Sequence, residues 1–261
     1  MPSQSKSKRV CVIGDSQMGS LRVADTNGLF EWPEEFEVEY WGANGPNFRQ
    51  LKWSDGALHA TGEALDSVRL INVAKRERIA VEDFDILVFY GCRLRMSSLF
   101  AAMLHWRYAQ GSWPSWAVLT EAVQAHANAC TAYRTAREFA KAGVEVVFIP
   151  SPLLTEGVVD PHGRKGALHD HPEAEHATPE DRAHLWFAQE EVATRDGIHF
   201  VRQPEDTIAS AIFTKSEFAC DGAYETGDNG HKSPEFAARV INDGLSALKG
   251  ETAPSSVALP T

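Results

Sequence analysis

The sequence has few cysteines, no long apolar run and fewer basic than acidic residues. Its 261 residues include four cysteines, which lie far apart and form no CxxC pair. Isolated cysteines of this kind are typical of reduced thiols, so we expect a cytoplasmic protein. No run of about 18 apolar residues is present, so the sequence predicts no transmembrane helix and no membrane partner.

The charge balance argues against nucleic-acid binding. The chain has 25 basic and 36 acidic residues, which gives a formal net charge of -11 at pH 7. Sequence-independent binding to nucleic acid needs clustered Lys and Arg on one face, and an acidic chain supplies such clusters poorly. We therefore expect a small-molecule partner and no nucleic acid.

The domain organisation is simple. The two ends are rich in Ser, Pro, Ala and Lys, and we expect disordered tails at 1–8 and 251–261. The 43% of apolar residues is ordinary for a globular core. No internal repeat or linker divides the chain, so residues 9–250 are predicted to form a single domain.

Apolar runs and helical periodicity alternate along the chain. The expected strands are 10–13, 36–41, 84–91, 144–150 and 197–201. The expected helices are 17–29, 98–108, 116–142, 179–195 and 233–248. Between them lie a possible hairpin at 54–56 and a long polar loop at 155–178. This alternation predicts an α/β fold with a mostly parallel sheet of about five strands, which would bind ligands beyond the carboxyl ends of the strands.

The first strand leads into the stretch that suggests chemistry. The apolar run 10–13 ends at Gly14-Asp15-Ser16. Gly14 permits a sharp turn, and Ser16 would then lie near the N-terminus of the following helix, where N–H groups and the helix dipole favour negative charge. Ser16 is therefore a candidate nucleophile. The alternative is that Ser16 only caps the helix.

A serine nucleophile needs a base, usually a histidine oriented by a carboxylate. Of the ten histidines, only His231 lies just before a C-terminal helix with an acid three residues earlier, Asp228. Glycines at 227 and 230 would let both side chains face one cleft. The alternative is that Asp228 and His231 form a surface turn and a helix start.

Gly14-Asp15-Ser16 after the first strand, with Asp228-x-x-His231 before the last helix, resembles the SGNH (GDSL-type) hydrolase family. The two motifs bracket nearly the whole chain. The resemblance implies a three-layer, flavodoxin-like α/β sandwich. It also implies that Ser16 is the nucleophile, His231 the general base and Asp228 the group that orients His231.

The same resemblance implies an oxyanion hole. The family uses the N–H of the nucleophile, here Ser16, a glycine after the second strand and an asparagine after the third. Gly45 matches the glycine best, with Gly42 as the alternative. The asparagine position holds Arg93, which would donate to an oxyanion, bind a substrate carboxylate or phosphate, or pair with Asp15.

Three further residues are candidates for substrate binding: Asp15, Asn44 and Asn47. Either asparagine would also fill the oxyanion position that Arg93 leaves open. His169-x-His171, with His176 and Asp170 nearby, is a candidate metal site, but the segment is rich in Pro, Glu and His with no Cys near, and we favour a solvated loop. No metal or cofactor is therefore expected.

The expected function is that of a serine esterase, which would hydrolyse a small O-acyl group, such as acetyl, on a carbohydrate or related metabolite. This substrate class is implied by the family resemblance. The same machinery would serve an O-acyltransferase. A catalytically weak binding protein that keeps the pocket is the alternative from another class, motivated by Arg93. A metal-dependent hydrolase using the histidine loop ranks last.

Overall fold

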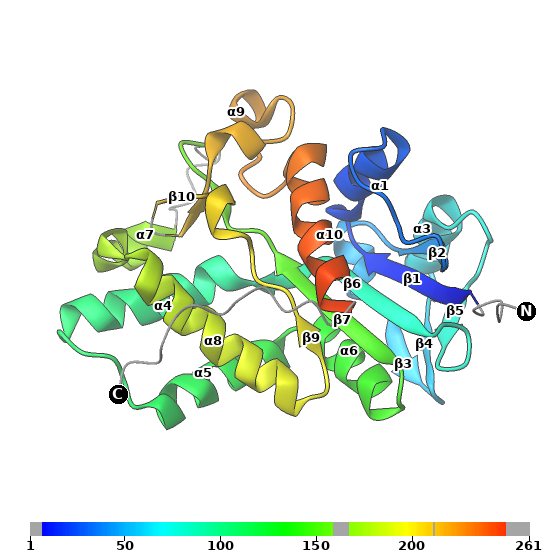
Figure 1. Cartoon of the computed structure of the whole chain (residues 1–261), viewed down its shortest axis with the longest axis horizontal. Coiled ribbons are helices and arrows are strands. Elements are labelled where there is room, and N and C mark those ends of the chain that lie inside the picture. The colour runs from blue at the N-terminus through cyan, green and yellow to red at the C-terminus, as the bar shows by residue number, and fades with distance from the viewer. Residues whose placement is uncertain (1–6, 159–166, 211, 249–261) are drawn as a thin grey trace, which may run out of the picture.

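A five-stranded parallel sheet forms the centre of the molecule (Figure 1). The computed structural model describes residues 7–158, 167–210 and 212–248. The strand order is β2-β1-β6-β7-β9, and every neighbouring pair is parallel. The strands are β1 (Lys8–Gly14), β2 (Phe36–Gly42), β6 (Ile86–Arg95), β7 (Glu145–Ser151) and β9 (His199–Phe200).

Helices cover both faces of this sheet. Along β1, Val10 and Val12 face one apolar core and Cys11 and Ile13 face the other, as the two-residue period of a strand requires. The first core is covered by α1 (Met18–Thr26) and α10 (Pro234–Leu248), which lie side by side in Figure 1. The second is covered by α4 (Met96–Ala109), α5 (Trp116–Ala129), α6 (Thr131–Lys141) and α8 (Pro179–Arg195). The predicted three-layer α/β sandwich is confirmed.

The predicted helix at 116–142 is wrong, because it is two helices. The chain between α5 and α6 is extended at Cys130, with φ −84° and ψ 115°. Apolar positions recur at helical spacing on both sides of this break, so the sequence pattern does not reveal it. The two helices bury their apolar faces against different surfaces: α5 packs on α8, and α6 packs on β6 and β7.

The region after β2 contains the expected hairpin and two helices that the sequence analysis did not predict. Asp55 and Gly56 have φ of 51° and 70°, which suits a two-residue hairpin turn. The elements are α2 (Gly45–Phe48), β3 (Lys52–Ser54), β4 (Ala57–His59), α3 (Glu63–Ile71) and β5 (Arg78–Ala80).

The predicted long loop at 155–178 is partly folded. Its described residues include α7 (Ala167–Asp170) and the 3₁₀ helix η1 (Pro172–His176), both packed against α4. Helices of four or five residues are too short to show a periodic pattern of apolar residues, so the sequence does not predict them. His162 lies outside the described residues. At the end of the segment, Thr178 and Asp181 form the reciprocal cap that begins α8.

The chain after α8 is built from short elements before it reaches α10. Strands β3, β4 and β5 form one small sheet. Another small sheet joins β8 (Leu154–Thr155), β11 (Phe213–Thr214) and β10 (Ile208–Ser210). Around it lie η2 (Glu205–Thr207), η3 (Ser216–Phe218) and α9 (Ala223–Thr226).

The folded domain begins one residue before the predicted boundary at residue 9. Lys8, expected in the N-terminal tail, is the first residue of β1. The predicted tail at 251–261 lies outside the described residues. Among the helices of the described ranges, none is both long and apolar enough to cross a membrane.

Three strands meet at the carboxyl edge of the sheet with no room for side chains. A Cβ on Gly42, at the end of β2, would lie 1.9 Å from the carbonyl oxygen of Gly14, at the end of β1. At Gly91, in β6, φ is +65° and a Cβ would lie 2.4 Å from Cβ of Gln17. Glycine at these positions lets the loops that come after the strands converge.

Gly42→Ala should therefore lower the free energy of unfolding by about 3 kcal/mol, at the upper end of what overpacking of a core costs. The measurement is urea denaturation of the purified variant. Gly19→Ala is the matched control, because Gly19 lies in α1 with no atom within 4 Å of its added Cβ, and it should be neutral or slightly stabilising. Equal stability of the two variants would contradict the close approach.

Candidate active site

The turn after β1 presents Ser16 to solvent. Met18 donates its N–H to the carbonyl of Asp15 at 3.1 Å, and Gly19 donates to that of Ser16 at 3.2 Å. The helix begins at Met18 with Gln17 as its N-cap residue, so the alternative that Ser16 is the cap is wrong. The Ser16 hydroxyl is thus free for another contact.

That contact is with His231, 215 residues away in the sequence. Ser16 Oγ lies 2.8 Å from His231 Nε2, and His231 Nδ1 lies 2.6 Å from Asp228 Oδ2. All three groups come from loops or turns beyond the sheet, two of them just before α10. In a tautomer with the proton on Nδ1, His231 donates to Asp228 and accepts from Ser16. This is the arrangement that a base-activated serine requires.

The loop that carries Asp228 holds its carboxylate in place. Gly227 ends α9 in the left-handed conformation, with φ 71°. Asp228 Oδ1 then accepts the N–H groups of Gly230 and His231, each at 3.1 Å. Burial acts to raise the pKa of Asp228, but these bonds and the pairing with His231 outweigh it and hold the pKa below its ordinary value. Asp228 therefore stays ionised beside the imidazole.

Two residues that the sequence analysis missed position this loop. The Gln17 amide donates to the carbonyl of Gly230 at 3.0 Å, which ties the Ser16 turn to the His231 loop. Lys232 is 2% exposed, and its Nζ donates to the carbonyls of Asn229 and Gly230 at 3.0 and 2.9 Å. Burial lowers the pKa of Lys232 to about 7. Gln17 follows Ser16 and Lys232 follows His231 in the sequence, and this adjacency is the signal that would have identified them.

Arg93 lies beside Asp15, the acid next to Ser16. Its backbone has φ +43°, unusual for a residue with a side chain, within the irregular end of β6. Arg93 Nε pairs with Asp15 Oδ2 at 2.9 Å, and Asp15 Oδ1 accepts the N–H of Gln17 at 3.1 Å. Burial raises the pKa of Asp15, although the Gln17 bond and Arg93 oppose that effect.

Gly45 is the glycine that lies next to Arg93. A Cβ on Gly45 would be 3.7 Å from Arg93 Nη2. Gly42, the alternative, is packed into the sheet against β1. Asn44 and Asn47 bond to each other, with Nδ2 of Asn47 donating to Oδ1 of Asn44 at 3.2 Å. Within the described residues, neither asparagine forms a hydrogen bond with Ser16.

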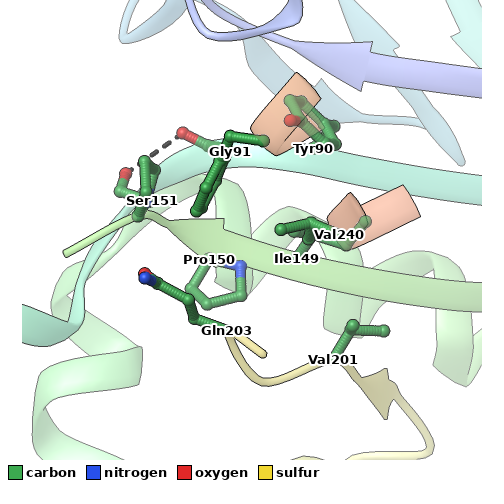
Figure 2. A pocket seen from close by; sticks show the side chains of 10 residues that line it. Tyr90, Gly91, Ile149, Pro150, Ser151, Val201, Gln203 and Val240 are labelled. Atoms are coloured by element: carbon green, nitrogen blue, oxygen red, sulfur yellow. Dashed lines mark hydrogen bonds between the residues drawn. The ribbon is translucent and has the colours of Figure 1, made fainter. Parts of the chain in front are cut away.

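A small apolar hollow lies beneath Gly91, between β6, β7 and α10 (Figure 2). Its volume is about 10 Å³, room for at most one water molecule. Ser151 Oγ donates to the carbonyl of Gly91 at 3.1 Å, drawn as the dashed line in Figure 2. This hydrogen bond fixes the end of β6 to the end of β7. The hollow itself is too small for a substrate.

The histidine segment shows no metal geometry. His169 pairs with the neighbouring Asp170 at 3.0 Å, and the ring of His171 lies 5.6 Å from that of His105. Within the ranges that the structure describes, no three His, Cys, Asp or Glu side chains are placed to hold a metal ion. The described part of the segment, α7 and η1, packs on α4.

No family model and no curated protein matches this chain. Among solved structures, it is similar to a DUF4886 family protein from Bacteroides uniformis, with 7% identity and a TM-score of 0.38 over 96% of this chain and 98% of that one. A putative GDSL-like lipase from Bacteroides ovatus has 10% identity and a TM-score of 0.36, over 94% of this chain and 53% of that one.

An extracellular lipase from Streptomyces rimosus has 12% identity and a TM-score of 0.38, over 94% of this chain and all of the other. These TM-scores are all below 0.5. A functional assignment therefore depends on the geometry of Ser16, His231 and Asp228.

Lys232→Met should remove a pH dependence of stability. Because the pKa of Lys232 is lowered from 10.5 to about 7 on folding, the unfolded chain binds more protons between these values. The lysine's contribution to stability therefore rises as pH increases through this window. The free energy of unfolding of wild type relative to the variant should be higher at about pH 9 than at about pH 6.5.

Urea denaturation at the two pH values measures this difference. Lys141→Met is the control, because the Lys141 side chain is 59% exposed on α6. A wild-type advantage that is the same at both pH values would show that the Lys232 ammonium is not buried.

Proposed function

We propose that the protein is a serine hydrolase of SGNH type that cleaves a small O-acyl ester. One observation carries this proposal: a continuous chain of hydrogen-bonding groups runs from Asp228 through His231 to Ser16, with steps of 2.6 and 2.8 Å. The order of the groups is that of an orienting carboxylate, a base and a nucleophile.

In the proposed reaction, Ser16 Oγ attacks the ester carbonyl carbon while His231 Nε2 takes the hydroxyl proton. Asp228 stabilises the imidazolium that forms. When the C–O bond breaks, His231 gives the proton to the leaving alcohol, which leaves the acyl group on Ser16. Water then attacks this acyl group, with His231 again taking and returning a proton. The carboxylic acid departs and Ser16 is restored.

The negative oxygen of the tetrahedral intermediate needs donors. The N–H of Ser16 donates to no acceptor in the described ranges, and the N–H of Gly45 lies at the start of α2 with no acceptor in that helix. Arg93, beside Gly45, adds a charged donor where the family has asparagine. These three groups form the proposed oxyanion hole.

The exposure of Ser16 suits a small acyl group on a larger, hydrophilic molecule such as a carbohydrate or related metabolite. An acyl group on an exposed serine is also accessible to an alcohol in place of water. The same site would then transfer the acyl group, so product analysis with an added alcohol is part of the assignment.

Ser16 should react with a fluorophosphonate probe. The expected result is a single adduct on Ser16 by mass spectrometry, with hydrolysis of a chromogenic acetyl ester in the unlabelled enzyme. Ser16→Ala should abolish both. Ser246→Ala is the control, because Ser246 Oγ bonds only within α10, to the carbonyl of Asn242. An unlabelled, inert wild type would favour the binding-protein alternative.

Asp228→Asn should lower kcat by about 10³- to 10⁴-fold with little change in KM. The amide NH₂ would face His231 Nδ1 and force the proton to Nε2, so that His231 no longer accepts from Ser16. Asp221→Asn, at an exposed aspartate seven residues earlier, is the control and should leave kcat unchanged. Full activity of Asp228→Asn would exclude the orienting role.

A further inference from the structure

A second hollow lies beside Arg93 and is lined by three arginines. Its volume is about 320 Å³, and its walls are the end of β6, the short helix α2, the end of α5 and the start of α6. The lining residues are Phe48, Arg49, Arg93, Arg95, Ala129, Cys130, Thr131 and Ala132. None of them is acidic. In a chain with a net charge of -11, this hollow concentrates positive charge.

Most of that charge is not neutralised by the protein. Arg93 is paired with Asp15 through Nε, which leaves its other guanidinium N–H groups for a ligand. Arg49 and Arg95 form no ion pair with any described carboxylate. Both side chains are exposed enough to reach a molecule from solvent. Guanidinium groups match carboxylate and phosphate oxygens in a two-pronged geometry.

The start of α6 adds to the same potential. Cys130, Thr131 and Ala132 are the N-cap residue and the first two residues of this helix, and Cys130 makes no side-chain cap bond. The N-terminus of an 11-residue helix carries partial positive charge. It therefore acts with the arginines on an anion in the hollow.

Arg93 links the hollow to the proposed active site. The guanidinium of Arg93 is paired with Asp15, the residue next to Ser16, and it lies against Gly45, the proposed oxyanion donor. A molecule whose ester carbonyl meets Ser16 would place a neighbouring group near Arg93. The volume lies at the lower end of the range for small-ligand pockets.

We infer that the substrate carries an oxyanion, a carboxylate or a phosphate, which binds among Arg49, Arg93 and Arg95 while its ester carbonyl meets Ser16. This inference depends on the proposed function for the position of the ester. It narrows the substrate class from any small O-acyl ester to an acylated acidic metabolite. Arg93 joins the two subsites, because it lines the hollow and pairs with Asp15, the residue next to Ser16.

The first test compares three acetyl esters of similar size: one with a carboxylate near the ester, one with a phosphate and one with a neutral amide. The expected kcat/KM is highest for an anionic ester, and the preferred anion identifies the group. Arg49→Gln and Arg95→Gln should each lower kcat/KM for that ester by about 10- to 100-fold, the effect of one lost bond to a charged group. Their activity on the neutral ester should stay within about threefold of wild type.

Arg195→Gln is the matched control, because Arg195 is 54% exposed on α8 and pairs with Glu191 on the same helix. Raising the salt concentration should weaken the preference for the anionic ester. Equal kcat/KM for the three esters in wild type, or equal losses on charged and neutral esters in the arginine variants, would overturn the inference.

The second test removes the chemistry. Inorganic phosphate and succinate are titrated separately into the Ser16→Ala variant, and calorimetry should detect binding. Binding should disappear in a variant that carries Arg49→Gln and Arg95→Gln together with Ser16→Ala. If fluorophosphonate labels Ser16 but neither anion binds, the inference fails and the proposed function stands. If an anion binds but Ser16 is not labelled, the proposed function fails, and with it the placement of an ester beside the anion.

Discussion

The close approach of strand ends at one edge of the sheet is the constraint on which the site depends. Gly42 meets the Gly14 carbonyl, and Gly91 meets Gln17, with no space for a side chain at either glycine. The loops that leave β1, β2 and β6 therefore begin within a few ångströms of each other. Ser16, Gly45 and Arg93 lie at or just after the ends of these three strands, and this is why we propose them for one site.

The site combines two carboxylates in opposite situations. Asp228 accepts two backbone N–H groups and faces His231, and together these keep it ionised against the effect of burial. Asp15 lies deeper, where burial raises its pKa, and it faces Arg93. In the proposed mechanism, Asp228 orients the base, while Asp15 pairs with an arginine that lines the hollow with Arg49 and Arg95. The arrangement assigns the two acids different roles through their surroundings alone.

The loop before α10 is held by contacts that do not take part in the proposed chemistry. The Gln17 side chain, from the turn after β1, donates to the Gly230 carbonyl. The buried Lys232 side chain donates to the same carbonyl. The Gln17 bond joins residues 213 positions apart, so the distance between Ser16 and His231 depends on the whole domain being folded. A nucleophile and base brought together in this way are positioned by rigid neighbours.

The sequence by itself determined the alternating α/β order, the turn at Ser16 and the pairing of Asp228 with His231, because each depends on local period or short spacing. It did not reveal the break at Cys130, since both halves of that stretch have helical periodicity and only their different packing surfaces require two helices. It named Arg93 but not its neighbours Arg49 and Arg95 as a cluster. Their shared hollow exists only because α2, the end of β6 and the start of α6 meet in three dimensions. Spacing along the chain does not predict this contact, because packing decides which distant segments lie together.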